Sequence, residues 1–572
     1  MTALPDQTNP ARNGATSRPF ERPAFLALCA FLLAPVIAHG LWRPLLHFFG
    51  PSAKASGAGA ITLCALAVSA AILIARELRP KQAPLHSLVL GGLVAIGASV
   101  GLRLGVPGFM TLLTVAVVLA FLLPPLSARL PTSLDGLARR HKLLFGVYVL
   151  PALFAVIKTA SLCTFIGDPA RADLQVLPGN TFTESHSCLT AYVHAADLSQ
   201  KRVDNLYDDA FWHGSLGLPP LPPGVENPYR PFHLDNFSYP PPFLLLTQPL
   251  APFTTDFPAQ RALWFGLNGL LFALGLWLVA RFVDGPFAHR VLLLAPLLFT
   301  SIPILITLQI GNFQLATVVL SILAMVALDR GRSATGGALL ALTILSKVSP
   351  GILGVVLLTQ RRLRSAAITA GFGVLLFALS VLRFGTKPVR AFLTYALPRL
   401  SSGRAFPFMD TDSGILTNMS PFGIPFKLHF LGLDIGDPWH VARRIAQVYT
   451  VGLVLLAITV ARRQGDRRDR ALTWMALLVL AALQSPFAPG YVTIGLVWAM
   501  TLLAVEVRSV PGAIGVAFLG LFILFTPPGV RPETMALQSM VQTALTIGVS
   551  AWLIVRRPRM AFENATPERN PP

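Results

Sequence analysis

The chain has 572 residues, of which 53% are apolar and 13% are charged, whereas soluble proteins carry about 25% charged residues. With a mean hydropathy of +0.62, this composition excludes an ordinary soluble protein and indicates a polytopic membrane protein. The net charge of +20 does not indicate nucleic-acid binding, because the basic residues form short clusters between apolar segments. Four cysteines are too few for a disulfide framework or a cysteine-based structural metal site.

Apolar segments long enough to cross a bilayer need about 20 residues. Five such spans are predicted before a long polar loop, at 24–42, 57–75, 86–103, 107–127 and 143–163. Nine follow it, at 259–280, 290–308, 313–328, 365–384, 445–461, 470–485, 490–507, 511–527 and 535–555. A further segment is interrupted at Ser349-Pro350 and is expected to form two short helices, 335–347 and 350–360. The predicted fold is therefore all-α, with about 16 transmembrane or half-membrane helices.

The distribution of Lys and Arg predicts the orientation of these spans. With residues 1–23 as a cytoplasmic tail, alternation makes every inside connection basic, including Arg361-Arg362-Leu363-Arg364 and a final tail at 556–572. Two long loops, 164–241 and 385–444, then lie outside. We expect a plasma-membrane (bacterial inner-membrane) protein with an N-terminal four-span module at 24–142, a core at 143–510 and C-terminal spans at 511–555.

The first long loop is the richest in chemistry, because nine of the 26 acidic residues and four of the 11 histidines lie in it. Cys163 and Cys188 bracket its start, and a disulfide between them is left open because it depends on an oxidising compartment. After the loop, residues 243–253 are too short to cross a membrane and follow three prolines, so they are expected to form a dipping or surface helix.

Lys347 lies beside the predicted break, where a cation in apolar surroundings is costly unless it is paired or hydrated. It either binds a lipid-linked phosphate or snorkels to the interface as an anchor. Gln309, Asn312 and Gln314 crowd one short turn, and their amides either bind hydroxyl groups or join neighbouring helices.

Residues 238–253, Ser-Tyr-Pro-Pro-Pro-Phe and onward, resemble the Tyr-Pro-Pro segment of family 87 glycosyltransferases. These are polyprenol-phosphate-sugar-dependent, mannosyltransferase-like enzymes of the glycosyltransferase C superfamily. The same order of motifs continues with Gln309-x-Gly-Asn312, the segment 336–350, Asn418-Met-Ser420 and the turn 485–491. The resemblance covers roughly residues 143–510 and implies a glycosyltransferase C-like bundle with two outer-face loops.

The resemblance also implies a carboxylate in the first outer loop that acts as general base. In the family an Asp precedes a Tyr-x-x-Ala-Ala helix, whereas here Tyr192 follows Ser185-His-Ser-Cys188. The nearest upstream carboxylate is Glu184, with Asp168 and Asp173 as alternatives and His186 as a substitute base. The remaining substrate-binding candidates are Tyr239, Lys158, Asp235 and Asn418, together with Lys347 and the three amides of the short turn.

The function expected from these features is transfer of a sugar, mannose by the resemblance, from a polyprenyl-phosphate donor to a glycan or glycolipid acceptor with inversion. Membrane lipid is the other expected partner. No cofactor and no metal are expected, because no recognisable ligand spacing occurs and Asp410-Thr-Asp412 faces away from nucleotide sugars. Two alternatives stay open. One is a transporter or lipid flippase, and the other is a non-catalytic homologue, since the expected Asp is missing.

Overall fold

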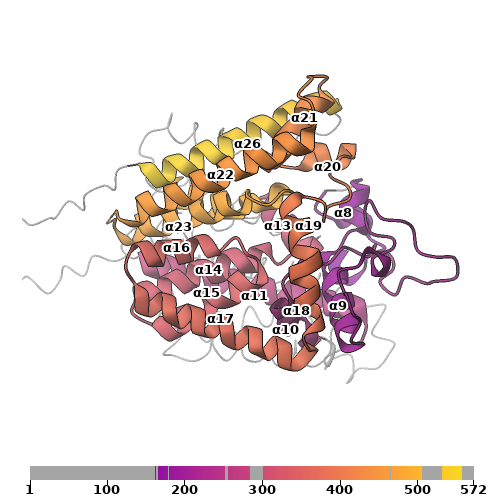
Figure 1. Cartoon of the computed structure of the whole chain (residues 1–572), viewed down its shortest axis with the longest axis horizontal. Helices are drawn as coiled ribbons and strands as arrows, with labels where there is room; N and C mark the ends of the chain where they lie inside the picture. The colour runs from indigo at the N-terminus through magenta and orange to yellow at the C-terminus, as the bar shows by residue number, and fades with distance from the viewer. Residues whose placement is uncertain are drawn as a thin grey trace, which may run out of the picture.

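A computed structural model describes residues 165–177, 179–250, 255–283, 301–463, 465–504 and 531–556, together with Leu162, Leu519 and Ile523. The predicted N-terminal spans 24–127, Cys163 and Lys158 lie outside the described residues. Within the described part all regular structure is helical and no strand occurs (Figure 1). The all-α class is thereby confirmed, while the total of about 16 helices remains a prediction.

Four described helices are long and apolar enough to cross a membrane, namely α11 (Phe257–Val283), α17 (Leu363–Phe384), α22 (Pro438–Ala461) and α26 (Pro532–Val555). They overlap the spans predicted at 259–280, 365–384, 445–461 and 535–555. A fifth candidate is the pair α13 (Ile302–Ile310) and α14 (Gln314–Asp329), which bends by 111° at its junction. These helices make the chain a polytopic membrane protein.

The remaining helices of the bundle are α15 (Ser333–Ser346), α16 (Gly351–Thr359), α23 (Arg467–Ala482), the turn η9 (Gly490–Thr493) and α24 (Ile494–Ala504). α14 and α15 approach closely because Gly336 has no side chain. A Cβ there would lie 2.7 Å from the carbonyl oxygen of Ala324 and 2.5 Å from Leu328 Cγ. Small residues at such contacts let apolar helices pack at short range.

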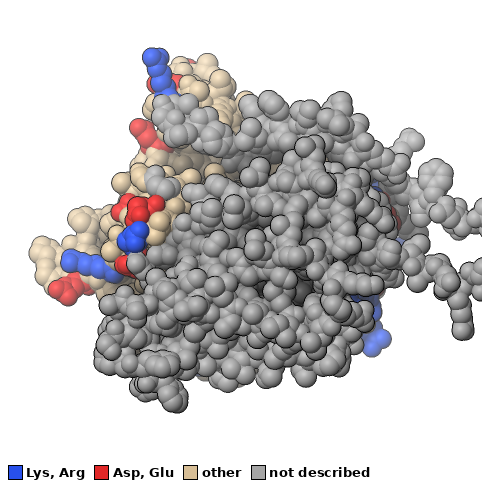
Figure 2. Space-filling model, turned by 180° about the vertical axis from the view of Figure 1, so that it is seen from behind, with Lys and Arg blue, Asp and Glu red and all other residues tan. Residues whose placement is uncertain are grey.

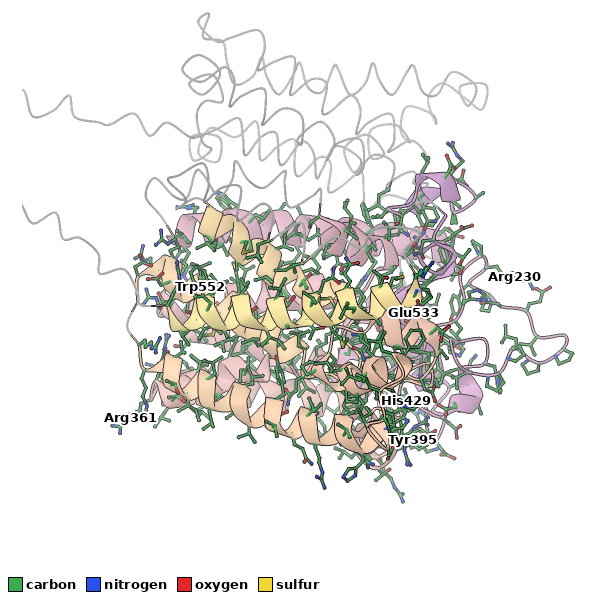
Figure 3. All side chains as sticks on the ribbon, turned by 90° about the horizontal axis from the view of Figure 1, so that it is seen from above. Arg230, Arg361, Tyr395, His429, Glu533 and Trp552 are labelled. Atoms are coloured by element: carbon green, nitrogen blue, oxygen red, sulfur yellow. The ribbon has the colours of Figure 1, made fainter. Side chains whose placement is uncertain are left out.

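The two ends of the bundle differ. Arg361 and Trp552 lie at one end, whereas Arg230, Tyr395, His429 and Glu533 lie at the other (Figure 3). Seen from behind, the visible acidic side chains of the described residues gather mainly at this second end (Figure 2). The basic connection at 361–364 and the two long loops are thus at opposite ends, while the outer-face position of the loops stays a prediction.

The two loops fold into short helices that cover one end of the bundle. The first contains η3 (Ala172–Leu174), α8 (Thr181–Ser185), α9 (Cys188–Gln200) and η4 (Asp209–Phe211). The second contains α18 (Lys387–Ala391), the π-helical turn η7 (Phe392–Ala396), α19 (Leu397–Ser402), α20 (Asp412–Thr417), η8 (Pro421–Gly423) and α21 (Ile424–Phe430). Ion pairs join the loops, with Arg399 Nη2 2.7 Å from Asp209 Oδ2 and Lys387 Nζ 2.6 Å from Asp204 Oδ1.

Backbone breaks occur where the sequence predicted them. α15 ends at Ser346 and α16 begins at Gly351, which confirms the interrupted pair. Residues 241–250 form three consecutive short turns, η5 (Pro241–Phe243), α10 (Leu244–Thr247) and η6 (Gln248–Leu250). Phe243, Leu244 and Leu250 are buried, and these turns contact α9, α15 and α17. The segment is therefore too short to cross, as expected, and it packs inside the protein rather than on its surface.

Candidate functional site

A buried polar cluster forms where the break at Lys347 meets the turn between α13 and α14. Gly311 adopts the left-handed conformation at φ +70°, which ends α13 and reverses the chain. The Lys347 ammonium donates to Asn312 Oδ1 over 3.1 Å and to Gln314 Oε1 over 2.9 Å. The turn and the break, which the sequence singled out separately, therefore build one site.

Burial weakens the charged form of this lysine. The residue as a whole is half-buried, but its ammonium is enclosed by protein, and burial lowers the pKa of Lys347 to about 8. The ammonium lies 5.6 Å from the centroid of the Tyr239 ring. Its partners are two neutral amides and an aromatic ring, so the positive charge is solvated but not neutralised by any described carboxylate in hydrogen-bond contact.

Aromatic side chains fix the ring beside Lys347. The Tyr239 and Tyr192 hydroxyls lie 2.8 Å apart, and the backbone N–H of Phe313 donates to Tyr192 Oη over 3.2 Å. Tyr239 stacks on Phe243 at 4.5 Å between centroids, and Tyr207 Oη donates to the Tyr239 carbonyl over 2.8 Å. The Tyr-Pro-Pro segment is thus held rigidly against α9 and the turn after α13.

Next to this cluster lie three side chains of the first loop, His186, Cys188 and Asp235. The Asn312 amide connects the two groups, because its Nδ2 donates to Cys188 Sγ over 3.2 Å and to Tyr491 Oη over 3.1 Å. His186 Nε2 lies 3.4 Å from Cys188 Sγ and 3.7 Å from Asp235 Oδ2. Burial lowers the pKa of His186, and burial together with Asp235 raises that of Cys188 well above its usual value.

The loop backbone around these side chains is tied to the start of α9. The His233 N–H donates to the Ser185 carbonyl over 2.8 Å, and the Asp235 N–H donates to Thr190 Oγ1 over 2.9 Å. Thr190 Oγ1 also lies 3.2 Å from the His233 carbonyl. These bonds bring Asp235 beside His186, although the two residues are far apart in the sequence.

The predicted base candidates occupy different surroundings. Asp173 is exposed, and its hydrogen bond with Arg171 lowers its pKa. Asp168 Oδ1 accepts from the Ala170 N–H over 3.2 Å. Glu184 is half-buried in α8, and within the described part of the chain no hydrogen bond or ion pair engages its carboxylate.

Gln309 and Asn418 use their amides in packing contacts. Gln309 accepts from the Val176 N–H over 2.7 Å and donates to the Thr183 carbonyl over 2.8 Å, which ties the first loop to α13. Asn418 accepts from the Ser420 and Ala488 N–H groups over 2.9 and 3.0 Å and donates to the Pro486 carbonyl over 2.8 Å. Both side chains are almost fully buried.

Several contributors were not singled out as site residues from sequence. Cys188 was considered only for a disulfide, but its thiol is free and buried. Tyr491 stood within a recognised motif without an assigned contact. Lys427 is buried and donates to the Asn418 carbonyl, and burial lowers its pKa to about 7. Its apolar neighbours in the sequence, Phe426 and Leu428, are the same kind of signal that singled out Lys347.

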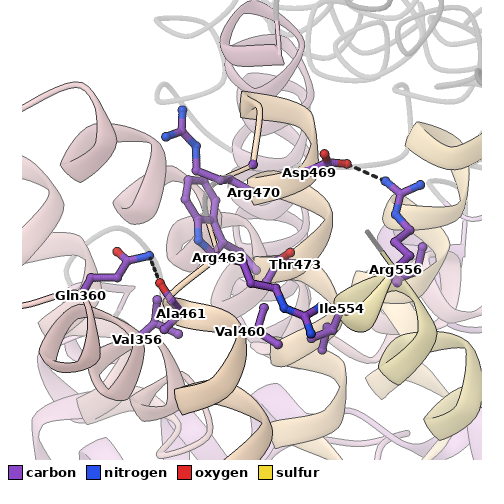
Figure 4. A pocket seen from close by; sticks show the side chains of 13 residues that line it. Val356, Gln360, Val460, Ala461, Arg463, Asp469, Arg470, Thr473, Ile554 and Arg556 are labelled. Carbon is purple, nitrogen blue, oxygen red and sulfur yellow. Dashed lines mark hydrogen bonds and ion pairs between the residues drawn. The ribbon is translucent and has the colours of Figure 1, made fainter. Parts of the chain in front are cut away.

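A separate pocket lies between the ends of α16, α22, α23 and α26 (Figure 4). Its polar groups bond to one another: Arg556 Nη2 lies 2.8 Å from Asp469 Oδ1, and Gln360 Nε2 donates to the Ala461 carbonyl over 3.0 Å. None of the predicted site residues lines it. It is at the end of the bundle that carries Arg361, opposite the Lys347 cluster.

Comparison with known proteins identifies one family. The model of glycosyltransferase family 87 matches residues 237–489, a region that contains Tyr239, Asn312, Gln314 and Lys347. This match confirms the resemblance drawn from the ordered motifs. No curated protein matches the chain.

Proposed function

We propose that this membrane glycosyltransferase, a member of family 87 through residues 237–489, moves a sugar from a polyprenyl-phosphate donor to an acceptor hydroxyl. Mannose is the proposed sugar, and a glycan or glycolipid is the proposed acceptor. The reaction is proposed to proceed with inversion, on the outer face of a bacterial plasma membrane.

The observation that carries the proposal is the Lys347 ammonium with its two amide acceptors. Phosphate oxygens are stronger acceptors than amide oxygens, because they are charged. A phosphate that enters the cluster would take hydrogen bonds from Lys347, and its Coulomb attraction would offset the desolvation free energy that burial costs the cation. The lipid tail of such a donor would remain in the bilayer beside the bundle.

The chemistry follows from the charge that develops on the donor. The acceptor oxygen forms a bond to the anomeric carbon from the face opposite the phosphate, and the bond from that carbon to the phosphate oxygen breaks. Polyprenyl phosphate leaves with an additional negative charge, which Lys347 stabilises. The proton of the acceptor hydroxyl passes to a general base.

Glu184 is our proposed base. Its carboxylate is free to take a proton, whereas Asp173 is paired with Arg171. The adjacent Thr183 bonds to Gln309, so α8 is anchored to the same end of α13 that leads into the Lys347 cluster. His186 is the alternative base, since burial favours its neutral form.

A transporter or lipid flippase is the rival function. Transporters of this size place charges near the membrane midplane between two related halves. The polar cluster described above instead lies under two unequal loops at one end of the bundle, which favours transfer at a membrane surface.

The decisive experiment uses the full-length protein in liposomes with a synthetic polyprenyl-phosphate mannose labelled in the sugar. We expect label to appear in a glycan acceptor and polyprenyl phosphate to be released in equal amount. Movement of intact labelled lipid between leaflets without transfer would support the transporter instead. If neither occurs with any polyprenyl-phosphate hexose, the chain is a non-catalytic homologue.

A further inference from the structure

We propose that His186, Cys188 and Asp235 form a binding site for one divalent transition-metal ion of the zinc class, with a fourth coordination position open. One ligand atom from each residue is available, and the three atoms all lie within 4.8 Å of one another. The site is inferred from this geometry alone and does not depend on the proposed glycosyl transfer.

The two ligand separations that involve His186 Nε2 are close to those of tetrahedral coordination, and the third, between Cys188 and Asp235, lies within 4.8 Å. Zinc bonds of about 2.3 Å to sulfur and about 2.0–2.2 Å to nitrogen or oxygen place pairs of tetrahedral ligands roughly 3.3–3.6 Å apart. His186 Nε2 lies 3.4 Å from Cys188 Sγ and 3.7 Å from Asp235 Oδ2. Thiolate, imidazole and carboxylate together favour zinc over magnesium or calcium, which prefer oxygen ligands alone.

The ligands are held by a framework that is already in place. Cys188 begins α9, whose N-terminus favours a negative sulfur. Asp235 is fixed through its backbone N–H to Thr190 Oγ1, and its Oδ1 accepts from the Asn236 N–H over 2.9 Å. The second carboxylate oxygen therefore points toward His186, and a metal ion needs only small side-chain adjustments.

Asn312 supplies the surroundings that such a site needs. Its Nδ2 donates to Cys188 Sγ over 3.2 Å, a contact that stabilises a thiolate. Its Oδ1 accepts from Lys347 over 3.1 Å. Binding of the metal ion displaces the proton of the Cys188 thiol to solvent, and the two positive charges of the metal replace that proton beside Asp235.

The open fourth coordination position of the metal ion would allow the site to bind a further ligand. Two of the ligand side chains are partly accessible, with exposed fractions of 17% for His186 and 27% for Asp235. Three protein ligands with one exchangeable position are typical of catalytic rather than structural zinc sites. An oxygen of a bound hydroxyl or phosphate group would take this position. A single residue, Asn312, connects the ligand Cys188 with the Lys347 ammonium.

The test is cobalt spectroscopy on the full-length protein, purified in detergent under reducing conditions and treated with a chelator. We expect one equivalent of Co²⁺ to give tetrahedral absorption bands and a thiolate-to-cobalt charge-transfer band, both removed by Zn²⁺. Cys188→Ser should abolish the charge-transfer band. His186→Gln and Asp235→Asn should each weaken zinc binding by at least about 10-fold, as loss of even an outer-shell partner does.

Two controls separate this site from adventitious binding. His429→Ala removes an exposed histidine of the same end of the molecule, and Cys64→Ser removes another cysteine; both should leave the cobalt spectrum unchanged. The melting temperature of each variant is measured without metal, so that a misfolded variant is recognised. Cys188→Ala is measured beside Cys188→Ser as a second variant that lacks the thiol. A charge-transfer band that survives both Cys188 variants, or wild-type binding well below one equivalent, overturns the proposal. Either result leaves the transfer assay with Lys347 and Glu184 unaffected.

Discussion

The Lys347 ammonium donates to Gln314 Oε1 over 2.9 Å and joins the break between α15 and α16 to the start of α14. Both residues end or begin an apolar helix, where backbone polar groups are left without helical partners. The pair therefore marks the place where two interrupted helices share a polar interior, and most of the expected chemistry follows from it.

Replacement of Lys347 should impair catalysis more than folding. Lys347→Met removes a buried cation whose partners are neutral amides, so the fold should lose little stability. Loss of the charge that stabilises the departing phosphate should lower kcat/KM by about 10²–10³-fold, as for other preorganised donors. The measurement is single-turnover transfer from polyprenyl-phosphate mannose. Lys387→Met, which breaks an exposed pair with Asp204, is the matched control and should retain nearly full activity.

The pH dependence of transfer should carry the signature of the same lysine. Because burial lowers the pKa of Lys347 to about 8, kcat/KM should fall as pH rises through about 8, where the free enzyme loses the cation. A bound phosphate favours the ammonium, so kcat should fall only at a higher pH. Lys347→Arg should move the alkaline limb of kcat/KM upward, since guanidinium stays protonated.

The pH dependence that Lys347 gives to folding stability is opposite to the one that it gives to kcat/KM. Its pKa is depressed in the folded protein relative to the ordinary lysine value of 10.5, so between about pH 8 and 10.5 the unfolded chain binds more protons. Folding stability from this group should therefore increase as pH rises through that window. Thermal unfolding of wild type and Lys347→Met over this range is the check, and equal pH slopes for the two proteins would exclude the assignment.

Hydropathy and charge could predict the helical class, the breaks and the grouping of loops at one end, because these follow from residue-local energies of burial. The site instead depends on contacts between residues that are far apart in the sequence, and residue-local burial energies do not predict such contacts. Lys347 and the amides of the turn were found separately because each is polar in an apolar context. Their contact depends on the packing of α14 against α15. Gly336 permits this close packing, but its presence in the sequence does not predict it.

The contacts that the first loop makes could not be predicted from the sequence. Gln309 was a substrate-binding candidate, with a bond between neighbouring segments as the alternative. In the structure its amide bonds to Val176 and Thr183, because a folded loop must satisfy its own backbone groups. Cys188 was weighed as a disulfide partner because cysteine spacing is all that sequence offers. His186 and Asp235 were candidates from the sequence, but their position beside Cys188 follows only from the way the loop folds on α9.

Glu184→Gln should test the assignment of the base. The substitution keeps size and hydrogen bonding but removes the proton acceptor, so kcat should fall by about 10²–10⁴-fold with little change in the KM for the donor. Asp173→Asn alters an exposed, paired carboxylate on the same loop and should behave as wild type. A wild-type kcat in Glu184→Gln would exclude Glu184 as the base and leave His186 as the proposed alternative.

The anchor that Gln309 provides should be measurable as stability of the first loop. Gln309→Leu leaves the Val176 N–H and the Thr183 carbonyl buried without this partner, and each such group costs about 1–3 kcal/mol. We expect a lower melting temperature in detergent and faster proteolytic cleavage within residues 164–241. Transfer should also slow, because α8 carries Glu184 and a misplaced base loses its alignment with the acceptor.

The matched control lies at the opposite end of the bundle. Gln360 also donates a side-chain amide to a backbone carbonyl, that of Ala461, over 3.0 Å, but it is half-buried, so water can replace the bond. Gln360→Leu should therefore cost at most about 1 kcal/mol and leave cleavage of the first loop unchanged. Equal cleavage in wild type and Gln309→Leu would mean that other contacts, such as the pair Arg399–Asp209, hold the loop without the amide.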